Sequence, residues 1–185
     1  ASFVGKYPIP VRYAMTIGEL ARLMNEEFSL GAQLQIVEME GWRRSSWWDD
    51  TGLHWVPPSP NMPTADTAMV YPGTCFIEGT NLSEGRGTTR PFEQIGAPYV
   101  DGSWLADVLN ERGLPGVLFR AVHFIPCSDK YANESCAGVQ LHVCDRSLFR
   151  PVTAGFEIVS AIRRQWPHDF DWRIPTSGIH NFDKL

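Results

Sequence analysis

Two segments with alternating apolar and polar residues constrain the fold of this chain more than any other feature. They cover residues 117–125 (VLFRAVHFI) and 138–144 (GVQLHVC), and a loop rich in polar residues joins them. Alternation of this kind is typical of half-buried strands, and two such runs in succession favour an antiparallel pair. We therefore expect these two strands to lie side by side in one sheet.

Segments with the residue spacing of helices precede and follow these two strands in the chain. A T-x-x-E capping box at Thr16–Glu19 begins a helix over 17–28, Gly113 ends one over 101–112, and Pro167 stops one over 153–166. Shorter patterns predict a helix over 65–71 and strands over 33–39 and 74–78. The expected fold class is α+β or mixed α/β, as a single domain with a mixed sheet flanked by helices and long structured loops.

Glycine and proline are frequent, with 16 and 14 residues among 185, so much of the backbone is expected to turn or to be irregular. Residues 41–63 hold four of the seven tryptophans and four prolines, which excludes a long regular element there. A structured loop of this length is usually functional. Its aromatic rings could stack on sugar rings or form a small core within the loop.

The charge pattern excludes some partners. The net charge is −5 and no basic cluster exceeds a pair, so nucleic acid is not an expected partner. No run of about 18 apolar residues is present, so no membrane span is expected. Of the 16 basic residues 13 are Arg, which favours a ligand with a carboxylate, although genomic composition explains such a bias equally well.

The four cysteines show no spacing typical of a zinc site, and no metal or other cofactor is expected. Cys127 and Cys136 flank the loop between the two main strands and could form a disulfide, which would imply an oxidising compartment. Four reduced thiols, mostly buried, are the alternative.

The polar segment 76–93 (FIEGTNLSEGRGTTRPFE) carries the strongest chemical pattern. Glu78 and Glu84 could converge on one substrate, and two carboxylates are what glycoside hydrolysis needs. Arg86 and Arg90 lie in the same segment. The alternative is that these four side chains form an ion-pair network that fixes the loop.

Three polar residues are expected on one face of the predicted sheet. Gln140 and His142 alternate with apolar residues along one strand, and Arg120 does so along its neighbour. Such a face could form the floor of a polar pocket. A structural hydrogen-bonding role for His142 is an equal alternative. A metal-dependent hydrolase that uses His142 together with Glu78 is a third hypothesis.

Several long segments resemble one enzyme family, the NamZ-type exo-β-N-acetylmuramidases. They are PIPVRYAMTIGELARLMN (8–25), VPPSPNMPT (56–64), YPGTCFIEGTNLSEGRGTTRPFEQIGAPYVDG (71–102), LPGVLFR (114–120) and GVQLHVCDR (138–146). The resemblance implies a bacterial glycosidase of cell-wall recycling. Such a hydrolase removes N-acetylmuramic acid from the non-reducing end of peptidoglycan fragments. The sequence does not establish the location, and a periplasmic or secreted location is expected rather than a cytoplasmic one.

The same resemblance implies a domain organisation. Residues 1–185 correspond mainly to the C-terminal domain of that family, and the N-terminal Rossmann-like domain, thought to hold a catalytic glutamate, is expected outside this chain. The domain would then form one wall of the substrate cleft, with the N-terminal domain as its partner. The alternative is a non-catalytic carbohydrate-binding or scaffolding domain.

The resemblance also selects the site residues. Glu78 and Glu84 are the catalytic candidates, and the candidates for substrate binding are Asn81, Arg86, Arg90, Arg120, Gln140 and His142.

Overall fold

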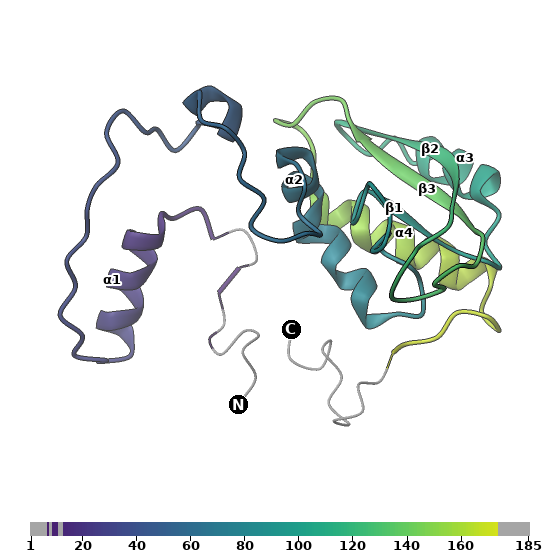
Figure 1. Ribbon diagram of the computed structural model, residues 1–185, viewed down its shortest axis with the longest axis horizontal. Helices are drawn as coiled ribbons and strands as arrows, with labels where there is room; N and C mark the ends of the chain where they lie inside the picture. Colours follow the sequence, from purple (N-terminus) through teal and green to yellow (C-terminus); the bar gives the residue numbers. More distant parts are fainter. Residues whose placement is uncertain (1–6, 8, 11–12, 174–185) are drawn as a thin grey trace. The chain divides into compact units, whose positions relative to one another are not determined.

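The computed structural model describes residues 7, 9–10 and 13–173 of the chain. The chain divides into two compact units, residues 1–54 and residues 55–185, here called unit 1 and unit 2. Figure 1 shows both units.

Unit 1 contains the helix α1 (Ile17–Glu27) and the short 3₁₀ helix η1 (Trp48–Thr51). The predicted capping box begins α1: the Glu19 amide donates to Thr16 Oγ1 at 3.1 Å, and the Thr16 amide donates to Glu19 Oε2 at 2.8 Å. These bonds satisfy two amides that the first helical turn leaves without partners. The α1 prediction is therefore confirmed.

The strand predicted over 33–39 is wrong, because this segment has no regular structure. Leu34, Val37 and Met39 are 44%, 88% and 62% exposed, so the apolar residues that suggested a strand are not packed against a second layer. A strand also needs a neighbour for its peptide groups. No strand pairs with this segment in the part of the chain that the structure describes.

Unit 2 contains the sheet and the remaining helices. Its helical elements are α2 (Ala65–Thr74), the 3₁₀ helix η2 (Cys75–Gly79), α3 (Gly102–Glu111) and α4 (Pro151–Gln165), and its strands are β1 (Gln94–Ala97), β2 (Val117–Phe124) and β3 (Cys136–Val143). The predicted helices over 65–71, 101–112 and 153–166 and the two main strands are confirmed. The α+β class is confirmed as well.

The sheet has the order β1-β3-β2, and both pairings are antiparallel. The mixed sheet of the prediction is therefore corrected to an antiparallel one. The reason is that β3 follows β2 as a hairpin and that β1, which the sequence did not reveal, pairs antiparallel with the other side of β3. Phe119 lies opposite Leu141 and Arg120 opposite Gln140, which fixes the two faces.

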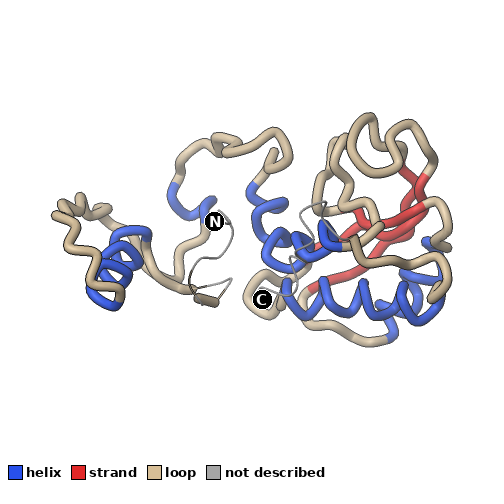
Figure 2. Tube along the Cα trace, turned by 90° about the horizontal axis from the view of Figure 1, so that it is seen from below, coloured by secondary structure: helices blue, strands red, loops and turns tan. Residues whose placement is uncertain are grey.

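The two faces of the sheet differ. One face contributes Ile95, Phe119, Val139 and Leu141 to the main core, which residues of α3 and α4 complete. Figure 2 shows the helices of unit 2 along one side of the strands. On the opposite face Val122, Phe124 and Cys136 form a second, smaller cluster with Tyr131. The same face also carries the polar side chains of Arg120, Gln140 and His142, together with the exposed Leu118.

The strand predicted over 74–78 is also wrong. This segment is η2, which continues directly from α2 as a tighter helix, with the Thr80 amide donating to the Ile77 carbonyl at 2.9 Å. Tightening of the last turn in this way is common at helix ends. Glu78 consequently lies on a helical turn and not at the end of a strand.

All four cysteines are free thiols in this structure. The structure agrees with the alternative of reduced thiols but not with their being mostly buried, because only Cys136 is buried, Cys75 is half-buried, and Cys127 and Cys144 are exposed. No helix among the described residues is long and apolar enough to cross a membrane.

Candidate functional site

The polar segment 76–93 is fixed to the sheet by its own backbone. Ser83 and Gly96 exchange two backbone hydrogen bonds of 2.8 and 3.1 Å, and the Phe92 amide donates to the Glu84 carbonyl at 2.6 Å. Gly85 has a φ of +76°, and a Cβ there would lie 2.8 Å from the Gln94 carbonyl oxygen. Only glycine suits both the left-handed conformation and the close approach. The loop therefore closes tightly beside the start of β1.

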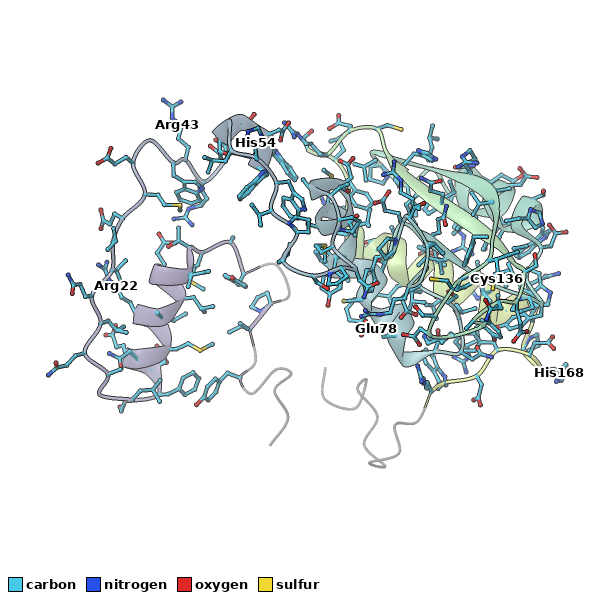
Figure 3. All side chains as sticks on the ribbon, viewed as in Figure 1. Arg22, Arg43, His54, Glu78, Cys136 and His168 are labelled. Carbon is cyan, nitrogen blue, oxygen red and sulfur yellow. The ribbon has the colours of Figure 1, made fainter. Side chains whose placement is uncertain are left out.

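One guanidinium joins the two candidate carboxylates. Arg86 Nε donates to Glu84 Oε1 at 3.0 Å, and a terminal Nη of the same residue forms an ion pair with Glu78. Glu78 extends from η2 at the end of the α2 ribbon (Figure 3). The sequence-based expectation that Glu78, Glu84 and Arg86 lie together is thus met by direct contacts. Arginine suits this position because its planar fork can serve two carboxylates at once.

The two carboxylates differ in accessibility. The Glu78 side chain is 38% exposed, whereas the Glu84 side chain is 3% exposed. Both oxygens of Glu84 are engaged, since Oε1 accepts from Arg86 and Oε2 accepts from the Lys130 ammonium at 2.9 Å. A reacting group must reach the substrate. The geometry therefore offers Glu78 to a ligand and keeps Glu84 inside.

Lys130 was not identified from the sequence. Its Nζ also donates to the carbonyls of Ile77 and Leu82, at 3.1 and 2.7 Å, which uses all three of its N–H groups. Burial lowers the pKa of the Lys130 ammonium, and the Glu84 carboxylate opposes that shift. No pattern in the sequence points to this residue, because its partners lie about 50 positions away along the chain.

An aromatic ring supports Arg86. The guanidinium carbon lies 4.9 Å from the centroid of the Phe92 ring, within the usual range of a cation–π contact. Burial acts to lower the pKa of Arg86, but its hydrogen bond and charge interaction with Glu78, together with Glu84, raise it. Asp129 lies near the same guanidinium, with Oδ2 at 3.9 Å from Nε. Arg86 therefore stays charged between several anionic groups.

Asn81 and Arg90 have partners outside this cluster. The Asn81 amide donates to the Asp169 carbonyl at 2.7 Å, and its oxygen accepts from the Tyr99 hydroxyl at 3.0 Å. Arg90 donates to Glu93 at 3.2 Å. Glu93 is buried and also accepts from the Thr67 hydroxyl at 2.6 Å, which ties the loop to α2. These contacts stabilise the loop around the cluster.

The polar face of the sheet is formed as expected. Arg120 donates to Gln140 Oε1 at 2.6 Å and to His142 Nε2 at 3.3 Å, across the β2–β3 pair. Gln94 of β1 lies directly opposite Gln140 on the other side. Because Gly85 packs on the Gln94 backbone, the loop that carries Glu84 and Arg86 borders this same row of side chains.

Six of the eight predicted residues therefore form two groups, each held together by its own contacts, and the other two hold segments nearby. Glu78, Glu84 and Arg86 form the first group, and Arg120, Gln140 and His142 form the second. Asn81 and Arg90 hold neighbouring segments. Within the described residues, no three His, Cys, Asp or Glu side chains are grouped as metal ligands would be, and the His142 imidazole contacts Arg120.

Two family models together match nearly the whole chain. Residues 69–185 match the family model described as exo-β-N-acetylmuramidase NamZ, C-terminal, and residues 1–66 match the corresponding N-terminal model. The two models thus divide the chain between residues 66 and 69. The assignment of the whole chain to a C-terminal domain stays a prediction.

One curated relative is the peptidoglycan β-N-acetylmuramidase NamZ of Bacillus subtilis strain 168. It is 51% identical over 185 residues, which is all of this chain and 44% of that protein. The chain therefore spans less than half the length of this relative.

Two solved structures of DUF1343 family proteins from Bacteroides fragilis NCTC 9343 share the fold. The first has a TM-score of 0.84 at 36% identity, and its match covers 90% of this chain and 44% of that protein. The second has a TM-score of 0.64 at 27% identity, and its match covers 88% of this chain and 43% of that protein. With a family match over residues 69–185 and this conserved architecture, the chain belongs to the exo-β-N-acetylmuramidase NamZ family.

Proposed function

We propose that this chain is part of a glycoside hydrolase that releases N-acetylmuramic acid from the non-reducing end of peptidoglycan fragments. The observation that carries the proposal is the 51% identity to a peptidoglycan β-N-acetylmuramidase along the whole of this chain. Unit 2 would form one wall of the substrate cleft, and an N-terminal domain would supply the other. A peptidoglycan substrate favours a periplasmic or secreted location.

Within this proposal the two glutamates have different roles. Glu78 is the carboxylate that acts on the glycosidic bond, as acid or base, because it is accessible and lies beside a fixed cation. Glu84 is buried between Arg86 and Lys130, and its role is to orient the Arg86 side chain. This division replaces the simpler expectation of two equivalent catalytic candidates.

The arginines provide the carboxylate recognition. N-acetylmuramic acid carries a lactyl carboxylate, and a guanidinium can bind a carboxylate with two parallel hydrogen bonds. Arg86 is 28% exposed and Arg90 is 45% exposed, so part of each side chain is accessible. Arg120, with Gln140 and His142, would contact the sugar from the sheet.

Replacement of each glutamate by Gln tests these roles, with the protein at its full natural length and a disaccharide that contains muramic acid. E78Q should lower kcat by roughly 100-fold or more, as loss of general acid–base catalysis does. E84Q should lower kcat less and should also destabilise the fold, because it leaves the buried Lys130 without its counter-charge.

The matched control is E111Q, which changes an exposed glutamate at the end of α3 and should keep wild-type turnover. A wild-type rate for E78Q would remove Glu78 from the mechanism.

One observation favours a second candidate, a non-catalytic carbohydrate-binding domain. All the charged groups of the cluster pair with one another, as they do in a structural ion-pair network. Calorimetry on this chain with N-acetylmuramic acid would show binding in either case. Turnover that is unaffected by both E78Q and E84Q would favour the binding domain.

A further inference from the structure

The ammonium of Lys130 is the least expected charged group of unit 2. Its side chain is 9% exposed, and it lies in the loop between β2 and β3, where its neighbours Asp129 and Tyr131 both have positive φ, +67° and +58°. Residues without a glycine's freedom seldom adopt this conformation, which clusters at functional sites. The backbone of this loop thus adopts an unfavourable conformation, which places Lys130 in contact with the polar segment 76–93.

Lys130 has no spare hydrogen-bonding capacity. Its three donors are used by the Ile77 carbonyl, the Leu82 carbonyl and the Glu84 carboxylate, at distances of 2.7 to 3.1 Å. The first carbonyl belongs to η2, which carries Glu78, and the second precedes Glu84 by two residues. A single cation therefore fixes both segments that supply the carboxylates.

From Lys130 outward, charges alternate along one path. The Lys130 ammonium contacts Glu84, Glu84 contacts the Arg86 guanidinium, and Arg86 contacts Glu78. The side chains at the inner end, Lys130 and Glu84, are 9% and 3% exposed, whereas those at the outer end, Arg86 and Glu78, are 28% and 38% exposed. The buried end is rigid and saturated, whereas the outer end is open to a ligand.

We infer that Lys130 is a positioning residue, which acts through Glu84 to hold the Arg86 guanidinium in the orientation that places it against Glu78 at the ligand-accessible surface. Only the expected effect on catalysis rests on the proposed function. The contacts themselves do not depend on the reaction.

The physical argument concerns the Glu84 carboxylate. With Lys130 present, Oε2 is occupied, so Oε1 is left for Arg86 Nε. Without Lys130, a buried carboxylate oxygen would lose its partner, which is strongly unfavourable. Glu84 would then rotate toward another partner, and this change releases Arg86 from one side. The Phe92 ring cannot compensate, because it supports the face of the guanidinium and does not fix its in-plane rotation.

A double-mutant cycle tests the path from Lys130 through Glu84. K130M should lower kcat by about as much as E84Q does, because both changes release Arg86, and should also raise KM, because the proposed function gives Arg86 the ligand carboxylate. In the E84Q background the same substitution should change kcat by less than about threefold, since residues that act in series are not additive. An equal loss of kcat in both backgrounds would overturn the inference.

The control variant is I158V, which trims a buried side chain of α4 away from the cluster and so lowers stability without touching the path. It should leave kcat at the wild-type value. If K130M alone does not fold, E84Q and the double variant K130M/E84Q still decide, because the double variant removes both charges of the Lys130–Glu84 pair. Equal kcat values support the path, and a further loss in the double variant contradicts it.

A second measurement separates this inference from the proposed function. The Nε–H proton of Arg86, assigned through R86K, should exchange slowly with water in a ¹H–¹⁵N spectrum of the wild type and of I158V. In K130M that signal should be lost or exchange at least tenfold faster. If the wild type shows no turnover, the proposed function fails and the spectrum still tests the inference. An unchanged Arg86 signal in K130M overturns it.

Discussion

At the scale of the residue, Phe92 shows how the backbone serves the cluster. Its φ of +63° is unusual for a bulky side chain, and its ring is 1% exposed. The ring lies against the Arg86 guanidinium on one side and meets the Tyr71 ring edge-on, with centroids 4.8 Å apart. Backbone strain of this kind is retained where the surroundings require it. Here it places an aromatic surface beneath the cation that joins Glu78 to Glu84.

The thiols give a prediction at the same scale. Burial raises the pKa of Cys75 and of Cys136 to about 11, so at pH 8 both stay protonated and unreactive. Cys127 and Cys144 are exposed. Native protein treated with a thiol reagent at pH 8 should therefore show two fast and two slow cysteines, and denatured protein four fast ones. Four slow thiols in the native state would contradict the exposure of Cys127 and Cys144. Fewer than four reactive thiols in denaturant without reductant would contradict the free-thiol description.

At the scale of the element, the contact between α2 and α4 depends on two glycines. A Cβ on Gly73 would lie 1.8 Å from the Pro151 carbonyl oxygen, and one on Gly155 would lie 2.2 Å from the Gly73 carbonyl oxygen. Both obstacles are backbone atoms that cannot move aside. The close packing of these helices positions η2, and with it Glu78, because η2 continues from α2.

Gly155→Ala should therefore destabilise the fold, although alanine is the better helix former. We expect a loss of about 1–3 kcal/mol in the free energy of unfolding, typical of overpacking. Denaturant unfolding measures this loss. The matched control D107A, on the exposed side of α3, should stay within about 0.5 kcal/mol of the wild type. A Gly155→Ala variant of unchanged stability would show that the two helices can separate without cost.

The elements with local signals were predictable. The capping box of α1, the apolar stripe of α3 and the alternation of β2 and β3 all lie within about 15 residues of sequence, and the structure confirms each. The segments 33–39 and 74–78 resembled strands by composition, but strand formation depends on a distant partner. Neither segment pairs in a sheet. The strand β1 was missed because it is only four residues long and contains Gly96.

At the scale of the whole molecule, the candidate site was predictable only in part. Glu78, Glu84 and Arg86 lie within nine positions, so their proximity followed from the loop itself. Arg120, Gln140 and His142 followed from the alternation of two strands. Lys130 could not be predicted, because it reaches Glu84 across 46 positions through a loop whose path depends on positive φ values.

The chain spans 44% of the length of the Bacillus subtilis relative, so the central claim concerns an activity of the protein at its full natural length. The most direct measurement is product analysis with two disaccharides of N-acetylmuramic acid and N-acetylglucosamine that differ only in order. We predict release of N-acetylmuramic acid when it occupies the non-reducing end, and no release when it occupies the reducing end. Equal cleavage of both, or cleavage of neither, would contradict the account.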